Sequence, residues 1–278
     1  MEITINEITN AIKRKKKGLW IPLGYSRRGL ELVNLADDNS AHILQGGSTG
    51  GGKSTLTKLI MVILHLVYTT GDVALWLMDL KQGNEIKLLG KNPLLVKNKC
   101  SNKEEAESFL GSLWNEVLRR YELFQEYDVT SIDEYNEIAE KRLPRILLII
   151  DEYNKLEGKE YNTARLLAKH ITGDGRSAGV HVYLSTHRPT ANLVDGTLKN
   201  NFPVTVAFRC NPVSARVLLG EDEWQMSKKI DAEIAGRALF SYTDQILLQV
   251  PLLSNADTKY IMSNYQAATI APKVTKAP

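Results

Sequence analysis

The sequence predicts an α/β fold in which a mainly parallel central sheet is flanked by helices. From residue 41 onward, short apolar runs typical of buried strands alternate with longer segments of helical periodicity. The first of these runs leads into a glycine-rich stretch at 47–52, which is followed by an apolar helix. A later run at 146–150 ends in two carboxylates. Alternation of this kind is typical of a parallel sheet covered by helices on both faces.

The composition is that of a globular protein with a buried core. The chain has 278 residues, of which 43% are hydrophobic and 24% are charged, and this length allows one or two domains. A formal net charge of +3 is weakly basic and does not by itself identify a nucleic-acid binder. Cys100 and Cys210 are too few for a disulfide framework, and no apolar stretch reaches the about 18 residues of a membrane span. We therefore expect a cytoplasmic protein with no membrane segment in this chain.

Three parts follow one another along the chain. Residues 1–40 carry a basic segment and lead-in strands, and 41–252 form the α/β domain. The C-terminal tail, 253–278, is expected to be partly disordered, because its end is rich in Ala, Thr, Lys and Pro. The basic run at 13–17 fits contact with DNA phosphates or acidic lipid headgroups, and it equally fits a solvated helix end.

The elements of the first half of the α/β domain can be placed in order. Residues 41–45 form a short strand and 57–67 an apolar helix. The continuous apolar run at 73–78 predicts a buried parallel strand. Residues 102–127 are predicted to form a long helix whose core face carries side chains at helical spacing: Phe109, Leu113, Val117, Tyr121 and Phe124.

The second half of the domain continues the alternation. Buried strands are predicted at 146–150, 180–185 and 204–208, with a helix over 161–171. Asn211 as the N-cap and Pro212 at the first helical position predict a short helix over 212–219. The runs at 239–242 and 246–250 predict a terminal hairpin.

The glycine-rich stretch has the pattern of a phosphate-binding loop. Gly47, Gly52, Lys53 and Ser54 occupy the fixed positions of G-x-x-x-x-G-K-[ST], between a strand and a helix. Glycines let successive N–H groups point at one phosphate, and the following helix directs its positive end there. The alternative, a chance glycine-rich turn, does not explain this context. We expect ATP or GTP to be bound by Gly47, Ser48, Thr49, Gly50, Gly51, Gly52, Lys53, Ser54 and Thr55, with Lys53 on the β- and γ-phosphates and Ser54 on Mg²⁺.

The carboxylates after the strand at 146–150 complete the expected reaction site. Asp151 is placed to hold Mg²⁺, directly or through water. Glu152 is placed to polarise the water that attacks the γ-phosphate, a pairing typical of hydrolases that run motors. The alternative interpretation is a helix N-cap followed by a first-turn acid.

The segment 175–189 supplies two further candidates. The strand at 180–185 is expected to lie between the P-loop strand and the strand that ends at Asp151, which puts His187 beside the γ-phosphate as a polar sensor. His181 lies within that strand and is interpreted as structural. Arg176, on the turn before the strand, could enter a neighbouring subunit's site and neutralise transition-state charge. The alternative for Arg176 is a surface salt bridge.

These motifs resemble those of the FtsK/SpoIIIE family of hexameric double-stranded DNA translocases, within the HerA–FtsK group of RecA-like motors. The resemblance runs from about residue 21 to 250 and includes the segments 42–54, 78–81, 114–121, 135–136, 143–152, 175–181, 185–189 and 195–203. It implies that 41–252 is a RecA-like P-loop ATPase motor domain. It further implies ATP and Mg²⁺ as cofactors, and a homohexamer that acts on double-stranded DNA.

The resemblance also implies roles for single residues. Arg176 matches the family's trans-acting arginine, Arg188 and Lys199 match basic positions that face DNA, and Asn192 lies on the same segment. The sensor is usually Gln in the family and is His187 here, which changes its tuning. The family's membrane-spanning N-terminus and winged-helix domain are expected to be absent. Such stand-alone relatives occur on conjugative plasmids, integrative elements and phages, which implies replication or transfer proteins as further partners.

The leading interpretation is therefore an ATP-driven DNA translocase of the FtsK type, acting in conjugative or mobile-element DNA transfer or in replication. The alternative is an FtsK-like ATPase that drives protein secretion, because related domains do so. A small nucleotide kinase is a third class, and Glu152 and the long central segment count against it. Arg188, Lys199 and the basic run at 13–17 favour DNA over a protein substrate.

Overall fold

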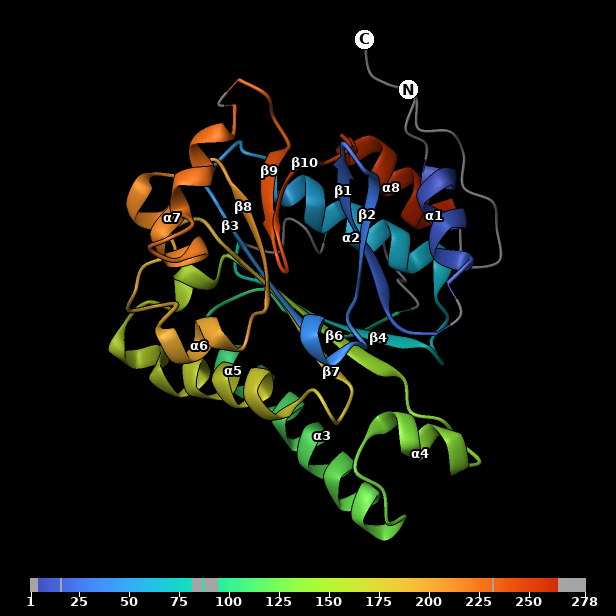
Figure 1. Cartoon of the computed structure of the whole chain (residues 1–278). Coiled ribbons are helices and arrows are strands. Elements are labelled where there is room, and N and C mark those ends of the chain that lie inside the picture. The colour runs from blue at the N-terminus through green and yellow to red at the C-terminus, as the bar shows by residue number, and fades with distance from the viewer. Residues whose placement is uncertain (1–4, 16, 82–86, 88–94, 232, 265–278) are drawn as a thin grey trace.

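The structure is a computed structural model, and it describes residues 5–15, 17–81, 87, 95–231 and 233–264. Within these residues, ten strands form one sheet in the order β2-β1-β10-β9-β8-β3-β7-β6-β4-β5. Helices cover both faces of this sheet (Figure 1), which confirms the predicted α/β fold. Among the described residues, no helix combines the length and the apolar character needed to cross a bilayer.

The parallel part of the sheet holds the strands that were predicted to be buried, together with β5, which was not predicted. Each of them except β5 is buried along nearly its whole length, because helices lie on both of its faces. β7 pairs with β3 on one side and with β6 on the other, which confirms the predicted central position of this strand. The strands are β3 (His42–Gly46), β4 (Val73–Asp79), β5 (Val96–Cys100), β6 (Arg145–Asp151), β7 (Val180–Thr186) and β8 (Val204–Phe208).

An antiparallel group of strands extends the sheet beyond β8. The predicted hairpin forms as β9 (Arg237–Ser241) and β10 (Gln245–Gln249), and β9 pairs antiparallel with β8. The lead-in strands β1 (Trp20–Ser26) and β2 (Gly29–Asn34) then add to β10. The N-terminal segment is therefore part of the same sheet as the α/β domain.

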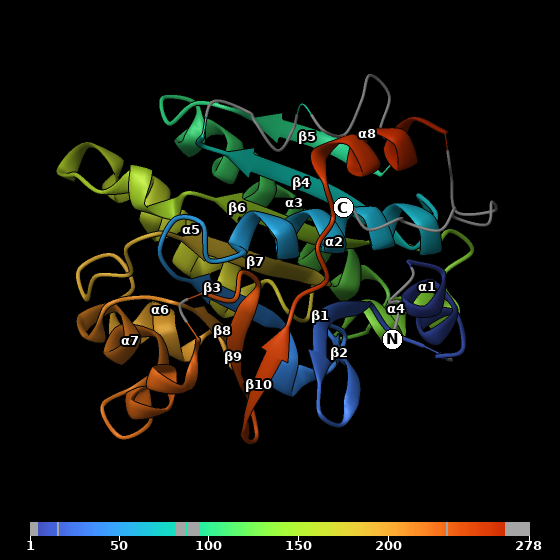
Figure 2. The same ribbon diagram turned by 90° about the horizontal axis from the view of Figure 1, so that it is seen from above.

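Two layers of helices enclose two apolar cores. On one face, α2 (Lys53–Val67) packs against α1 (Ile5–Lys13) and α8 (Asn255–Asn264). On the other face, α3 (Ala106–Glu126) packs against α5 (Asn162–Asp174) (Figures 1 and 2). The remaining α-helices are α4 (Ile132–Ile138), α6 (Gly196–Asn200) and α7 (Pro212–Leu219). Short 3-10 helices form η1 (Asp38–Ser40), η3 (Tyr153–Leu156), η4 (Lys159–Tyr161) and η5 (Trp224–Lys229).

Several boundaries and elements differ from the prediction. The long helix begins at Ala106 rather than near 102, after a loop in which Asn102 accepts a hydrogen bond from the backbone of Glu105. The Asn211 cap is confirmed, because its side chain accepts a hydrogen bond from the N–H of Ser214. α1, β5, α4, α6 and α8 were not predicted. The segment expected to be a partly disordered tail contains α8, and its residues 265–278 lie outside the described residues.

Candidate nucleotide-binding site

The loop between β3 and α2 has three glycines at positive φ, and at two of them there is also no room for a side chain. Gly47 and Gly52 have φ angles of 151° and 117°, in the region that L side chains rarely adopt. A Cβ at Gly47 would lie 2.6 Å from Cβ of Phe208, and one at Gly52 would lie 2.7 Å from Cα of Gly236. Gly52 is the N-cap of α2 and offers no side-chain acceptor to the first N–H groups of the helix. These donors are therefore available to an anion, as a phosphate site requires.

Neighbouring strands hold this loop through backbone hydrogen bonds. The N–H of Gly47 donates to the carbonyl of Thr186 at the end of β7, over 3.3 Å. The N–H of Ser48 donates to the carbonyl of Arg209 after β8, over 2.7 Å. The N–H of Gly236 donates to the carbonyl of Gly51 over 3.0 Å. The turn before β9 is therefore attached directly to the glycine loop.

Lys53 is the first residue of α2, and its ammonium is turned toward the loop. Nζ donates to the carbonyl oxygens of Gly47 and Ser48 over 2.6 and 3.0 Å, and it lies 3.0 Å from Nδ1 of His187. Burial lowers the pKa of Lys53 to about 8, although nearby carboxylates oppose the shift. A polyphosphate at this position would replace weak neutral acceptors with charged ones and favour the ammonium form.

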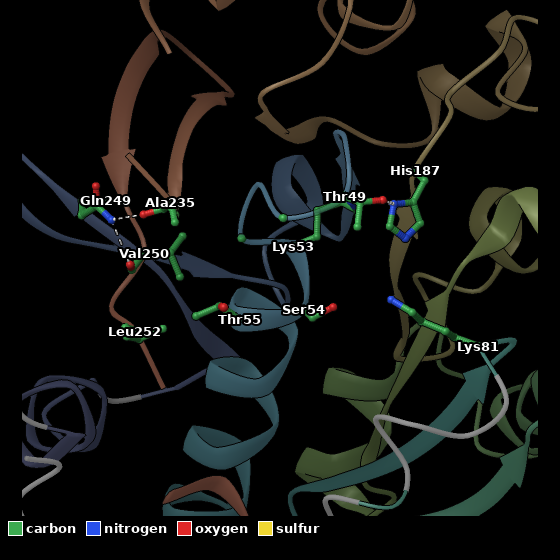
Figure 3. A pocket seen from close by; sticks show the side chains of 13 residues that line it. Thr49, Lys53, Ser54, Thr55, Lys81, His187, Ala235, Gln249, Val250 and Leu252 are labelled. Atoms are coloured by element: carbon green, nitrogen blue, oxygen red, sulfur yellow. Dashed lines mark hydrogen bonds between the residues drawn. The ribbon is translucent and has the colours of Figure 1, made fainter. Parts of the chain in front are cut away.

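His187 connects Lys53 to Glu152. An ammonium can only donate, so Nδ1 of His187 accepts from Lys53, and the ring proton then sits on Nε2. Nε2 lies against Oε1 of Glu152. The hydroxyl of Thr49 also lies 3.4 Å from Nδ1. The predicted sensor therefore touches both the P-loop and the predicted general base. Figure 3 shows His187 beside Thr49 and Lys53 of the P-loop.

Glu152 stands at the end of β6 in an unusual backbone conformation. Its φ and ψ are 62° and 43°, the left-handed region, which costs a residue other than glycine about 1–3 kcal/mol. Its side chain is almost fully buried beside His187 and Lys81. Burial pushes the pKa of Glu152 up, but the hydrogen bond from His187 and the nearby cations outweigh it and lower the pKa. The carboxylate is therefore kept ionised, as a residue that orients water needs to be.

The surroundings of Asp151 are those of a cation ligand rather than those of a helix N-cap. It is buried at the end of β6, and its Cα partner in β4 is another buried carboxylate, Asp79. Burial raises the pKa of Asp151, and a hydrogen bond with Ser185 only partly opposes this. A divalent cation beside these carboxylates would stabilise their ionised forms, and oxygen ligands are those that Mg²⁺ prefers. Asp151 at the end of β6 and the hydroxyl of Ser54 in the first turn of α2 are the residues of this chain that would hold it.

A cavity of about 270 Å³ opens in front of these groups (Figure 3). One wall was predicted, and it consists of the P-loop, the start of α2 and His187. The rest of the lining was not predicted, and it comes from Lys81 after β4 and from the C-terminal hairpin with its flanking residues. For Lys81 the available signal was its place in the segment 78–81, which resembles a family motif and ends two residues after a buried strand. The lining residues are Thr49, Gly50, Gly52, Lys53, Ser54, Thr55, Lys81, His187, Ala235, Gly236, Gln249, Val250 and Leu252.

Arg176 lies at the other edge of the sheet. It precedes β7, whereas His187 follows it, and seven strand residues span about 20 Å. Nε of Arg176 lies 3.4 Å from Oδ1 of Asp38 in an exposed ion pair. Arg176 also lines a separate cavity of about 650 Å³ together with Arg145 and His181. The structure therefore does not bring Arg176 to the other predicted catalytic residues of the same chain.

The predicted DNA-contacting residues differ in their exposure. Arg188 and Asn192 are exposed on the segment that follows His187. Lys199, in contrast, is half-buried, its Nζ donates to the hydroxyl of Thr205 over 2.7 Å, and burial lowers its pKa. The ammonium of Lys199 is therefore directed into its own subunit.

Comparison with known proteins places this site in a family. The profile of the FtsK/SpoIIIE family matches residues 10–191, more than half of the chain. The chain belongs to the FtsK/SpoIIIE family. The DNA translocase FtsK of Staphylococcus aureus (strain Mu50) is 33% identical over an alignment of 232 residues that covers 78% of this chain and 29% of that protein. An FtsK-like protein of Nostoc sp. (strain PCC 7120) is 32% identical over 236 residues, covering 81% of this chain and 31% of its own length.

Solved structures share the fold of this FtsK/SpoIIIE chain. The pCW3 conjugation coupling protein TcpA, in a monomer form with ATPγS, has a TM-score of 0.76 and 23% identity, covering 90% of this chain and 71% of its own. The cytoplasmic domain of the type VII secretion ATPase EccC of Thermomonospora curvata has a TM-score of 0.80 and 19% identity, covering 100% of this chain and 36% of its own. At these identities the likeness concerns the fold. The chain spans less than a third of the length of the curated relatives quoted above.

Proposed function

We propose that this chain hydrolyses ATP and uses the reaction to move double-stranded DNA through a hexameric ring. The observation that carries the ATPase part is the contact of His187 with both Lys53 and Glu152 at the mouth of a glycine loop. In this proposal Lys53 is the phosphate-binding ammonium, His187 is the sensor, and Glu152, in contact with His187, is the ionised base. A nucleotide kinase needs no such base, so the arrangement supports hydrolysis.

Each group then has a definite part in the reaction. The N–H groups at the start of α2 and the ammonium of Lys53 bind the phosphates. Mg²⁺, when bound by Ser54 and Asp151, neutralises charge on the phosphate oxygens. Glu152 accepts a hydrogen bond from the attacking water and orients it in line with the γ-phosphate. When Lys53 turns to phosphate, it leaves Nδ1 of His187, so the state of the nucleotide reaches the end of β7 through this ring.

The part of the proposal that concerns DNA rests on the relatives and on the segment after His187. The FtsK of Staphylococcus aureus, which is 33% identical, is a DNA translocase, whereas the secretion ATPase EccC is 19% identical. Arg188 and Asn192 are exposed directly after the sensor and are the proposed contacts to the DNA backbone. Lys199 is not proposed as a contact to the DNA backbone, because its ammonium donates to the hydroxyl of Thr205. Roles in conjugative transfer or replication, with transfer or replication proteins as partners, remain within this proposal.

The experiment that tests this function is an ATPase assay with and without linear duplex DNA. We expect hydrolysis that needs Mg²⁺ and rises with DNA, and we expect Arg188→Ala to reduce both the DNA affinity and its salt dependence. Loss of one phosphate contact lowers the slope of log K against log salt by about one. Lys199→Ala is the matched control and should keep the wild-type slope. If duplex DNA neither binds nor stimulates at low salt, the secretion ATPase becomes the better proposal.

A further inference from the structure

We infer that Lys81 is a second lysine of the site, and that its ammonium binds the terminal phosphate of a nucleoside triphosphate and distinguishes it from a diphosphate. This inference rests on the ATPase proposed above and names a further group that binds the substrate. Lys81 follows β4, while Lys53 begins α2, so the two lysines come from different elements around one cavity.

The backbone fixes where Lys81 starts. Its N–H donates to Oδ1 of Asp79 over 3.0 Å, and the N–H of Leu80 donates to the carbonyl of Asp151 over 3.3 Å. β4 and β6 also pair in register, with Asp79 opposite Asp151. The end of β4 is therefore attached to the strand end that carries Asp151 and Glu152. The side chain of Lys81 leaves from this fixed point into the cavity (Figure 3).

Among the described residues, the ammonium of Lys81 has unused capacity to donate. Nζ lies 3.7 Å from Oε1 of Glu152, which is beyond the 2.7–3.2 Å of a normal hydrogen bond. An ammonium carries three donors, and its side chain is 41% exposed, whereas that of Glu152 is 6% exposed. Lys53, in contrast, already donates to two carbonyls and to His187. Lys81 is thus the less tightly bound of the two cations, and its ammonium is free to donate to a phosphate oxygen.

The chemistry of the ligand explains the selectivity. The α- and β-phosphates are held by the glycine loop and the start of α2, which Lys81 does not touch. The γ-phosphate would lie toward Glu152, because that carboxylate orients the attacking water. Lys81 and His187 both line the cavity, and both contact Glu152. A triphosphate therefore draws Lys81 away from Glu152 and leaves the carboxylate to the water, while a diphosphate leaves the two residues together.

The test compares triphosphate and diphosphate binding. Fluorescent mant-ATPγS and mant-ADP are titrated with Mg²⁺ into the whole chain as wild type, Lys81→Met, Lys81→Arg and Lys155→Met. Lys155→Met is the matched control, because Lys155 is an exposed lysine three residues after Glu152 that does not line the cavity. Lys81→Met should weaken triphosphate binding about tenfold or more, the loss expected for one hydrogen bond to a charged group, with diphosphate binding unchanged. Lys81→Arg should restore most of the selectivity.

Two other outcomes overturn the inference, and they differ from a failure of the proposed function. If Lys81→Met weakens both nucleotides equally, Lys81 contributes only general positive charge. If its binding equals that of wild type while its melting temperature is retained, Lys81 does not touch the nucleotide. If wild type itself binds neither nucleotide, the ATPase proposal fails, and the role of Lys81 falls with it.

Discussion

At the residue scale, the proposed hydrolysis depends on one carboxylate whose backbone has a left-handed conformation. Glu152 has a left-handed backbone, is buried, and stays ionised because His187 and the cations around it outweigh burial. Glu152→Gln should keep nucleotide binding and lower kcat by about 10²-fold or more, because an amide cannot accept the proton of the attacking water. Steady-state ATPase and mant-nucleotide titration measure the two effects separately. Hydrolysis at the wild-type rate would show that another group orients the water.

At the element scale, the C-terminal hairpin supports the glycine loop. Gly236 has a φ of 81°, and a Cβ there would lie 2.9 Å from both Nε2 of Gln249 and the carbonyl of Val250. Gly236→Ala should therefore push this turn away from Gly51 and weaken ATP binding at least several-fold. Gly220→Ala is the matched control, because its φ of 89° is similarly strained and nothing lies within 4 Å of the added Cβ. It should cost about 1 kcal/mol of stability and leave nucleotide affinity unchanged. If the two variants changed nucleotide affinity equally, the hairpin would not contribute to nucleotide binding.

At the scale of the whole molecule, one chain holds the two halves of its proposed reaction site at opposite edges of the sheet. The glycine loop lies at the carboxyl ends of the parallel strands, and Arg176 precedes β7 at the other edge. In a ring, the Arg176 edge of one subunit can face the loop of the next. Arg176→Ala protein mixed with Glu152→Gln protein should then recover ATPase activity, because some interfaces combine an intact Glu152 with an intact Arg176. Gains of 10³–10⁵ from such arginines in phosphoryl transfer make recovery easy to detect, even at about a quarter of the sites.

The ion pair between Arg176 and Asp38 supplies the control for that experiment. Exposed pairs of this kind contribute about 0–1 kcal/mol, so their loss changes stability little. Asp38→Asn breaks the pair and keeps the guanidinium, and it should retain ATPase activity. If Asp38→Asn is as inactive as Arg176→Ala, or if co-assembled mixtures show no recovery of ATPase activity, the ion pair rather than a trans contact explains the activity lost in Arg176→Ala.

The sequence by itself determined the parts of the site that are local. The strand, glycine loop and helix around Lys53 are contiguous, and their backbone requirements are met by glycines whose spacing is visible in the chain. Asp151 and Glu152 follow a buried strand, and the order of alternating strands predicted that His187 would reach the same edge. These predictions held because parallel strands with short connections leave few arrangements.

Only the tertiary structure decided which distant segments complete the cavity. Lys81 reaches the loop through the pairing of β4 with β6, and Gly236 and Gln249 reach it through the pairing of β9 with β8. The hairpin of β9 and β10 was predicted, but no periodicity in the sequence encodes which strand it pairs with. The same holds for Lys199, which turns inward because Thr205 of β8 offers an acceptor six residues away. Local pattern fixes a backbone segment, whereas the direction of a long charged side chain depends on the nearest polar partner that packing provides.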